Sequence, residues 1–259
     1  MIGALVEHRH AEPVMGTVAS FLLVGGDAGT LARATAAACD VLHRADEVFS
    51  TWRPESPLSR IRRHVITVDD APPEVAEVLE LCREMVERSG GWFDPWRMPG
   101  GVDPTGLVKG WATRQAARVL AATGAEGGLL NVGGDIATFG APAGGGPWRA
   151  GVRHPLSAEH LTCVAALAGE LSAMATSGAY ERPDHVLDPF TGVPATRLLS
   201  ATVVGPDLAV ADAVATGLFA AGEDGLDLLA GLPGYEAWIV TPECAVHRTA
   251  GFPIVDPLR

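Results

Sequence analysis

Residues 89–140 read SGGWFDPWRMPGGVDPTGLVKGWATRQAARVLAATGAEGGLLNVGGDIATFG and hold the pattern that decides the fold. After the single lysine, apolar residues recur at helical spacing and stop at Gly124, a residue type that commonly ends helices. Two short apolar runs then surround Gly133-Gly134, which predicts two strands joined by a tight turn. This turn would present Asn131 and Asp135. The expected order is therefore a loop, a helix and a hairpin.

Lys109 is the only lysine in the chain, and Gly106 and Gly110 flank it. A helix start offers free backbone N–H groups, and glycines let a ligand approach the main chain. Together with one ammonium group, these features suit an anionic group such as a phosphate. The stretch is neither a GxxxxGK[ST] loop nor a GxGxxG loop. Considered alone, the single lysine could also be a product of chance.

The flanking sequence predicts an α+β fold in which mixed or antiparallel sheets are flanked by helices. We expect one domain over residues 1–259, with a cleft between two parts of it. A loop rich in hydroxyl groups and prolines is expected at residues 49–60. Helices are expected at 31–48, 74–88 and 208–221, and strands at 14–25, 147–153, 162–167, 170–175, 200–205 and, as a closing pair, within 235–259.

The charge of the chain limits its partners. The formal net charge is −12, which argues against binding to nucleic acid or to an anionic membrane surface. An acidic protein also repels a phosphate ligand unless a divalent cation lies between them, so we expect a bound metal ion.

Neither a signal segment nor a membrane-spanning run is recognisable, which predicts a cytoplasmic protein without membrane insertion. The cysteines show no CxxC motif and no Cys/His zinc spacing. We interpret them as reduced core residues. They are Cys39, Cys82, Cys163 and Cys244.

Asp212 and Thr216 are the candidate metal ligands. They are four residues apart on an otherwise apolar helical segment, so their oxygens should lie on one face, one turn apart. Two hard oxygen ligands suit Mg²⁺, which keeps coordination positions for phosphate and water. The alternative is a partly buried aspartate that accepts a hydrogen bond from the threonine.

Two further side chains have two possible roles each. Trp52 in the 49–60 loop is either a lid over the core or a surface on which a ring stacks. His185 precedes a Val-Leu pair and an Asp-Pro turn, which places it at the mouth of a strand, either as a solvated histidine or as a functional one.

Together these segments resemble the FAD:protein FMN transferase (ApbE) family over residues 15–222. Eight motifs occur in the order of the family. They are Met15-Gly16-Thr17; Ser50…Ser56…Ser59-Arg60; Gly91-Trp92-Phe93-Asp94-Pro95; Asp103…Gly106…Lys109-Gly110; Asn131-Val132-Gly133-Gly134-Asp135; Thr176-Ser177-Gly178…Tyr180; His185-Val186-Leu187-Asp188-Pro189…Thr191-Gly192; and Ala211-Asp212-Ala213…Thr216.

The resemblance implies a T-fold-like core and an enzyme that cleaves FAD, transfers FMN through a phosphoester bond to a threonine of a target flavoprotein, and releases AMP. It implies Mg²⁺, or Mn²⁺, held by Asp212, Thr216 and the backbone carbonyl of Gly106. Lys109 would hold a phosphate or the adjacent loop, and His185 would take the proton of the acceptor threonine. The residues expected to line the FAD site are Met15, Trp52, Trp92, Phe93, Asp94, Asp103 and Val186.

Two alternative functions stay open: an FAD pyrophosphatase that uses water as the acceptor, and a non-catalytic FAD-binding or storage protein. The chain also departs from the family pattern. Pro57 and Arg62 stand where the family usually has an acidic residue and an asparagine. The segment between Asp94 and Asp103 is short.

Overall fold

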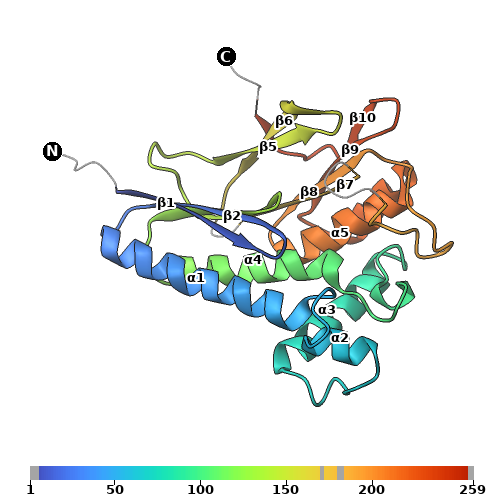
Figure 1. Cartoon of the computed structure of the whole chain (residues 1–259). Coiled ribbons are helices and arrows are strands. Elements are labelled where there is room, and N and C mark those ends of the chain that lie inside the picture. The colour runs from blue at the N-terminus through green and yellow to red at the C-terminus, as the bar shows by residue number, and fades with distance from the viewer. Residues whose placement is uncertain (1–5, 170–171, 180–183, 256–259) are drawn as a thin grey trace.

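The structure is a computed structural model that describes residues 6–169, 172–179 and 184–255, and its elements form three layers (Figure 1). The middle layer is a sheet of eight strands in the order β1-β2-β3-β4-β7-β8-β9-β10, and every neighbouring pair is antiparallel. The α+β prediction is therefore confirmed. The strands are β1 (Glu7–Val14), β2 (Thr17–Val24), β3 (Gly127–Val132), β4 (Asp135–Gly140), β7 (Ser172–Gly178), β8 (Ser200–Gly205), β9 (Glu236–Val240) and β10 (Val246–Arg248).

Helices cover one face of this sheet. Their alanine- and leucine-rich faces pack on the sheet and on one another to form the main hydrophobic core. A buried arginine, Arg114, reaches from one helix to Asp207, the N-cap of another, at 2.6 Å. The helices are α1 (Ala28–Phe49), α2 (Pro57–Arg62), α3 (Pro73–Arg88), α4 (Thr105–Ala121) and α5 (Leu208–Ala221), with 3₁₀ segments η1 (Pro95–Arg97) and η2 (Glu223–Gly231).

A small second sheet covers the opposite face. It contains β5 (Trp148–His154), β6 (Ser157–Leu167) and β11 (Ile254–Val255) in the order β11-β6-β5. A second apolar cluster joins the two sheets, and it includes Trp148 and Trp238.

Strand β1 was not predicted, although the strand that follows it was. Most of its residues are polar, and most of its positions are exposed at the edge of the sheet. It therefore lacks the alternation that identifies a half-buried strand. The turn between β1 and β2 places Met15 and Gly16 at φ angles of 53° and 71°.

Three local predictions need correction. Lys109 lies inside helix α4, which ends at Ala121 and not at Gly124. Gly110 is required by helix packing, because an added Cβ would lie 2.5 Å from the carbonyl oxygen of Leu208. The 49–60 loop contains the start of α2, whose N-cap is Ser56. A tertiary contact at Gly110 and the Ser56 cap of α2 overrode the local pattern.

The free cysteines follow the prediction except for Cys244, which is exposed; the other three are buried. Within the described ranges, no helix has both the length and the apolar character needed to cross a bilayer.

Candidate functional site

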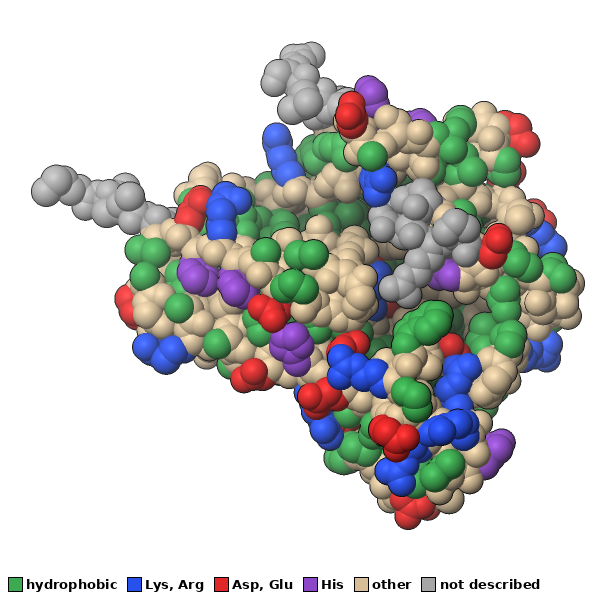
Figure 2. Space-filling view, in the orientation of Figure 1, with side chains coloured by type: hydrophobic (Ala, Val, Ile, Leu, Met, Phe, Trp, Pro, Cys, Tyr) green, Lys and Arg blue, Asp and Glu red, His purple; other side chains and the backbone are tan. Residues whose placement is uncertain are grey.

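A cavity of about 490 Å³ lies where the β1–β2 turn, the end of α1 and the first turns of α4 meet β7 and α5. Figure 2 shows this face hollowed above the part of the molecule that contains α2 and α3. Every residue that the sequence proposed for catalysis, flavin binding or metal binding lines this cavity. Residues far apart in the chain therefore converge on one cavity.

The three proposed metal ligands lie together where α4 crosses α5. The hydroxyl of Thr216 is 3.4 Å from the carbonyl oxygen of Gly106 and 3.3 Å from the hydroxyl of Ser177 on β7. The carboxylate of Asp212 accepts a hydrogen bond of 2.8 Å from the backbone N–H of Gly110. The glycines of α4 permit this approach, since Cβ atoms there would meet the side chains of Asp212 and Thr216.

Asp135 completes this inner end of the cavity. It begins β4, is fully buried, and lies 3.1 Å from the ammonium group of Lys109. Lys109 also lies 3.5 Å from the carbonyl oxygen of Gly133. The sequence placed Asp135 beside a Gly-Gly turn but gave it no role. The signal was its position directly after the Gly133-Gly134 turn, at the start of β4, yet only the folded sheet shows what it faces.

Asp135 and Asp212 are in contact, and the loss of solvation through burial raises the cost of ionising each of them. Burial raises the pKa of Asp135, although Lys109 opposes this effect. Burial, followed by the neighbouring Asp135, raises the pKa of Asp212 well above its usual value, and Lys109 again opposes the shift. Among the described residues, two buried carboxylates thus face the single positive charge of Lys109.

This donor set fits a hard divalent cation. Within the described part of the chain, Asp135 Oδ1 is buried and forms no hydrogen bond, and carboxylate, hydroxyl and carbonyl oxygens are the ligands that Mg²⁺ prefers. A cation beside Asp212 would stabilise the ionised forms of both aspartates.

Of the three aromatic residues predicted for the flavin site, Trp52 is exposed, whereas Trp92 and Phe93 pack against other side chains or the backbone. Trp52 has 86% of its surface exposed, so the prediction of a lid over the core is wrong. Its position on the cavity rim agrees with the stacking alternative. Trp92 packs edge-on against Phe190 at 4.8 Å between ring centroids, and Arg197 lies over its face. Phe93 is buried, and its N–H donates to Ser89.

The two acidic residues of the flavin-site prediction already have structural partners. Asp94 caps η1 through the N–H of Trp96 and pairs with Arg97. Asp103 accepts from the N–H of Thr105 at the start of α4 and pairs with Arg62 at 2.8 Å.

Arg62, one of the two residues that depart from the family pattern, also donates to the carbonyl oxygens of Pro99 and Val102. It therefore holds the short 99–103 segment at the edge of the cavity.

The remaining predicted site residues lie along the walls. Met15 is partly buried in the β1–β2 turn, and Val186 is buried. His185 is exposed beside Val186 and faces the cavity that it helps to line. Tyr180 of the quoted motif lies outside the described residues.

The serines of the 49–60 segment have local structural roles. Ser56 and Ser59 both donate to the carbonyl oxygen of Ser50, at 2.5 and 3.0 Å. Ser56 also accepts from the N–H of Ser59. These contacts shape the rim that carries Trp52.

The site lies in an antiparallel α+β fold, where buried carboxylates and two glycine-packed helices meet at one cavity. A comparison with protein-family models identifies the family that has this sequence pattern. The model described as the ApbE family matches residues 15–99 and 96–239. The chain belongs to the ApbE family.

Solved structures agree on the fold. The chain is similar to the flavin transferase ApbE from Vibrio cholerae, with a TM-score of 0.80 and 21% identity over 95% of this chain and 97% of that one. It is equally similar to the ApbE protein from Thermotoga maritima, with a TM-score of 0.80 and 23% identity over the same shares.

Curated relatives carry the name FAD:protein FMN transferase. The relative from Treponema pallidum is 31% identical over 176 residues, which cover 61% of this chain and 48% of the relative. The relative from Haemophilus influenzae is 33% identical over 132 residues, which cover 48% of this chain and 38% of the relative. The chain thus spans about half the length, or less, of these relatives.

Proposed function

We propose that this chain is a Mg²⁺-dependent FAD:protein FMN transferase. It would cleave FAD, attach FMN by a phosphoester bond to a threonine of a target flavoprotein, and release AMP. The names of the curated relatives support the flavin-transfer activity. The cavity supports it independently, because it combines an exposed aromatic side chain, a lysine, a histidine and hard oxygen ligands.

One observation carries the proposal. Asp212, Thr216 and the carbonyl of Gly106 line the same cavity as Lys109 and His185. A protein that only stores FAD needs neither a base nor a site for a divalent ion. Behind this group, Asp135 Oδ1 is buried and forms no hydrogen bond with the described residues, which is an additional reason to expect a cation there.

The residues divide the work of phosphoryl transfer among them. A divalent ion held by Asp212, Thr216 and Gly106 would supply positive charge against the pyrophosphate. Lys109 orients a phosphate oxygen from α4. His185 accepts the proton of the acceptor threonine as its oxygen attacks the phosphorus of the FMN half. The bond from that phosphorus to the bridging oxygen breaks, and AMP leaves with this oxygen.

Binding of the ring system falls to the outer cavity. Trp52 offers a face for stacking of the flavin, whereas Met15, Trp92, Phe93 and Val186 supply apolar wall. In this arrangement Asp94 and Asp103 contribute indirectly, because they fix η1 and the start of α4 beside the flavin-binding part of the cavity.

The test is to incubate the protein with FAD, Mg²⁺ and a threonine-bearing flavoprotein domain. We expect AMP in solution and an added FMN mass on the acceptor threonine, and Mn²⁺ should replace Mg²⁺. AMP and free FMN without labelled acceptor would favour the pyrophosphatase instead, and intact FAD in the presence of Mg²⁺ would favour a binding protein. Asp212→Ala should abolish Mg²⁺-dependent AMP release; surviving release would refute the metal assignment. The cytoplasmic location stays a prediction.

A further inference from the structure

A second group of metal-binding side chains lies away from the cavity, between edge strand β1 and helix α1. His8, His10 and Glu12 alternate along β1 and line one shallow groove with Cys39 and His43 of α1. Figure 2 shows histidine side chains gathered on the face over these two elements. This groove shares no lining residue with the main cavity.

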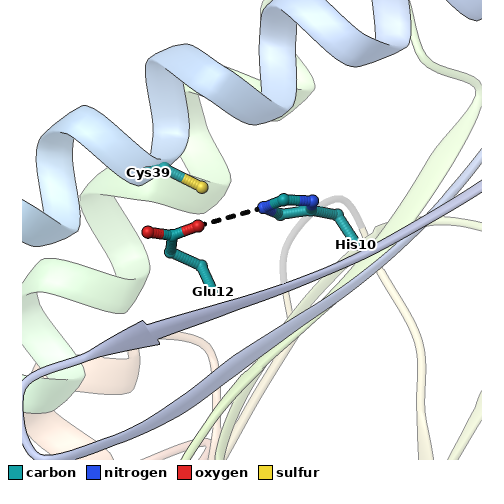
Figure 3. Close-up of side chains that lie close together, drawn as sticks. All are labelled: His10, Glu12 and Cys39. Atoms are coloured by element: carbon teal, nitrogen blue, oxygen red, sulfur yellow. Dashed lines mark hydrogen bonds and ion pairs between the residues drawn. The ribbon is translucent and has the colours of Figure 1, made fainter.

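The geometry of this group is compact. One ligand atom each from His10, Glu12 and Cys39 lies within 4.8 Å of the other two (Figure 3). Glu12 is fixed between two imidazoles: one oxygen is 3.3 Å from Nε2 of His10, and the other is 2.7 Å from Nε2 of His43. The thiol of Cys39 is buried and points into the same space from the helix.

We propose that His10, Glu12 and Cys39 form a site for Zn²⁺ or a similar transition-metal ion, with His43 as a positioning residue for Glu12. The ligand set decides the class of ion. One imidazole nitrogen, one thiolate sulfur and one carboxylate oxygen are ligands of zinc, whereas Mg²⁺ and Ca²⁺ prefer oxygen alone. Three protein ligands on an open groove leave the fourth position to water.

The thiol is protonated until an ion binds. Burial raises the pKa of Cys39 to about 11, and the carboxylates of Glu12 and Asp40 add to the effect. The ion would take the place of this proton, which leaves to solvent. The bound ion would itself supply the positive charge that stabilises the Cys39 thiolate.

The position of the site gives it a structural consequence. It joins α1 to β1, the edge strand whose turn to β2 contributes Met15, Gly16 and Thr17 to the wall of the main cavity. A bound ion would therefore fix the hairpin on the helix and support that wall from outside. This inference does not depend on the flavin chemistry, since it uses none of the residues assigned to it.

The experiment is a Co²⁺ titration of the full chain in saturating Mg²⁺, which keeps the oxygen-rich site occupied. We expect one equivalent to bind with a near-ultraviolet thiolate-to-cobalt charge-transfer band, and Zn²⁺ to displace it. Cys39→Ser should abolish the band. The matched control is Cys244→Ser, since Cys244 is the exposed cysteine of the described chain and should leave the band unchanged.

A second set of variants separates ligation from folding. His10 is exposed, so His10→Gln should keep the thermal unfolding temperature of the metal-free protein and lose stoichiometric Co²⁺ binding. His43→Gln should weaken binding by about 10- to 100-fold, as expected for a group that orients a ligand. Absence of the band in the unmodified chain, its persistence in Cys39→Ser or His10→Gln, or its loss in Cys244→Ser would each overturn the proposal.

Discussion

A single added methyl group at Gly110 tests whether the crossing of α4 and α5 positions the proposed metal ligands. The backbone of Gly110 is helical, so alanine meets no φ restriction there. Its Cβ would nevertheless lie 2.5 Å from the carbonyl oxygen of Leu208 and 2.7 Å from Cβ of Asp212. An ordinary contact is 3.4 Å or more, so α5 must retreat by about 0.9 Å.

The expected cost of Gly110→Ala has three parts. Overpacking costs about 1–3 kcal/mol. The 2.8 Å hydrogen bond from the Gly110 N–H to Asp212 is stretched, and a bond to a charged acceptor is worth about 1.5–3 kcal/mol. Alanine recovers about 1 kcal/mol of helix propensity. The free energy of unfolding should therefore fall by about 1.5–5 kcal/mol.

Urea unfolding measures the stability change, and the Mg²⁺ dependence of AMP release measures the displacement of Asp212. In Gly110→Ala the free energy of unfolding should fall, and AMP release should require a higher Mg²⁺ concentration. Gly217→Ala on α5 is the matched control, because its Cβ would lie 3.3 Å from the nearest atom, the N of Phe93. That variant should stay within about 1 kcal/mol of the parent, since the propensity gain offsets a slight contact. Equal effects of the two substitutions, or an unchanged Mg²⁺ requirement in Gly110→Ala, would refute the reasoning.

Three further predictions concern the charges and the base. Lys109→Met should lower the free energy of unfolding by about 3–5 kcal/mol without Mg²⁺, because it leaves the buried Asp135 carboxylate without its lysine, and by less with Mg²⁺. In urea unfolding, adding Asp135→Asn should recover part of this loss. Strictly additive effects of the two substitutions would contradict the pairing. His185→Ala should slow FMN transfer while FAD affinity, measured by fluorescence quenching, stays nearly constant; an equal loss of affinity would make His185 a binding residue. The raised pKa of Asp212 means that the ion-free folded state binds a proton more tightly than the unfolded state, so the contribution of Asp212 to stability is lost as pH rises. The affinity for Mg²⁺, measured by calorimetry, should weaken as pH falls from about 8 to 5, because protons compete with the ion for this carboxylate. An Mg²⁺ affinity that does not change with pH would exclude Asp212 as a ligand.

The sequence predicted most of the helical layer, because its periodicity reflects burial against one sheet. The pair Asp212 and Thr216 was predicted for the same reason: helical spacing alone puts their oxygens on one face. Edge strand β1 was not predicted, since its exposed polar side chains carry no hydrophobic signal. Its partner β2 was predicted because the sheet buries it.

The features missed at the site depend on contacts between distant segments. Asp135 meets Lys109 only because β4 lies beneath α4, and no spacing along the chain encodes that meeting. The cluster of His10, Glu12 and Cys39 was missed for the same reason. Its members come from strand β1 and helix α1, which pack together, so the spacing of the cysteines along the chain gives no zinc motif.

The balance of charge at the inner end of the cavity constrains how a dinucleotide can enter. Asp135 and Asp212 together carry two negative charges when ionised, and Lys109 compensates one of them. The pyrophosphate of FAD adds two more charges to a molecule whose formal net charge is already −12. Coulomb repulsion in a poorly solvated pocket grows steeply with each added charge. Under the proposed function, a divalent ion would therefore take part in the binding step as well as in the chemistry. The glycines of α4 would matter because they let the proposed ligands of that ion approach one another.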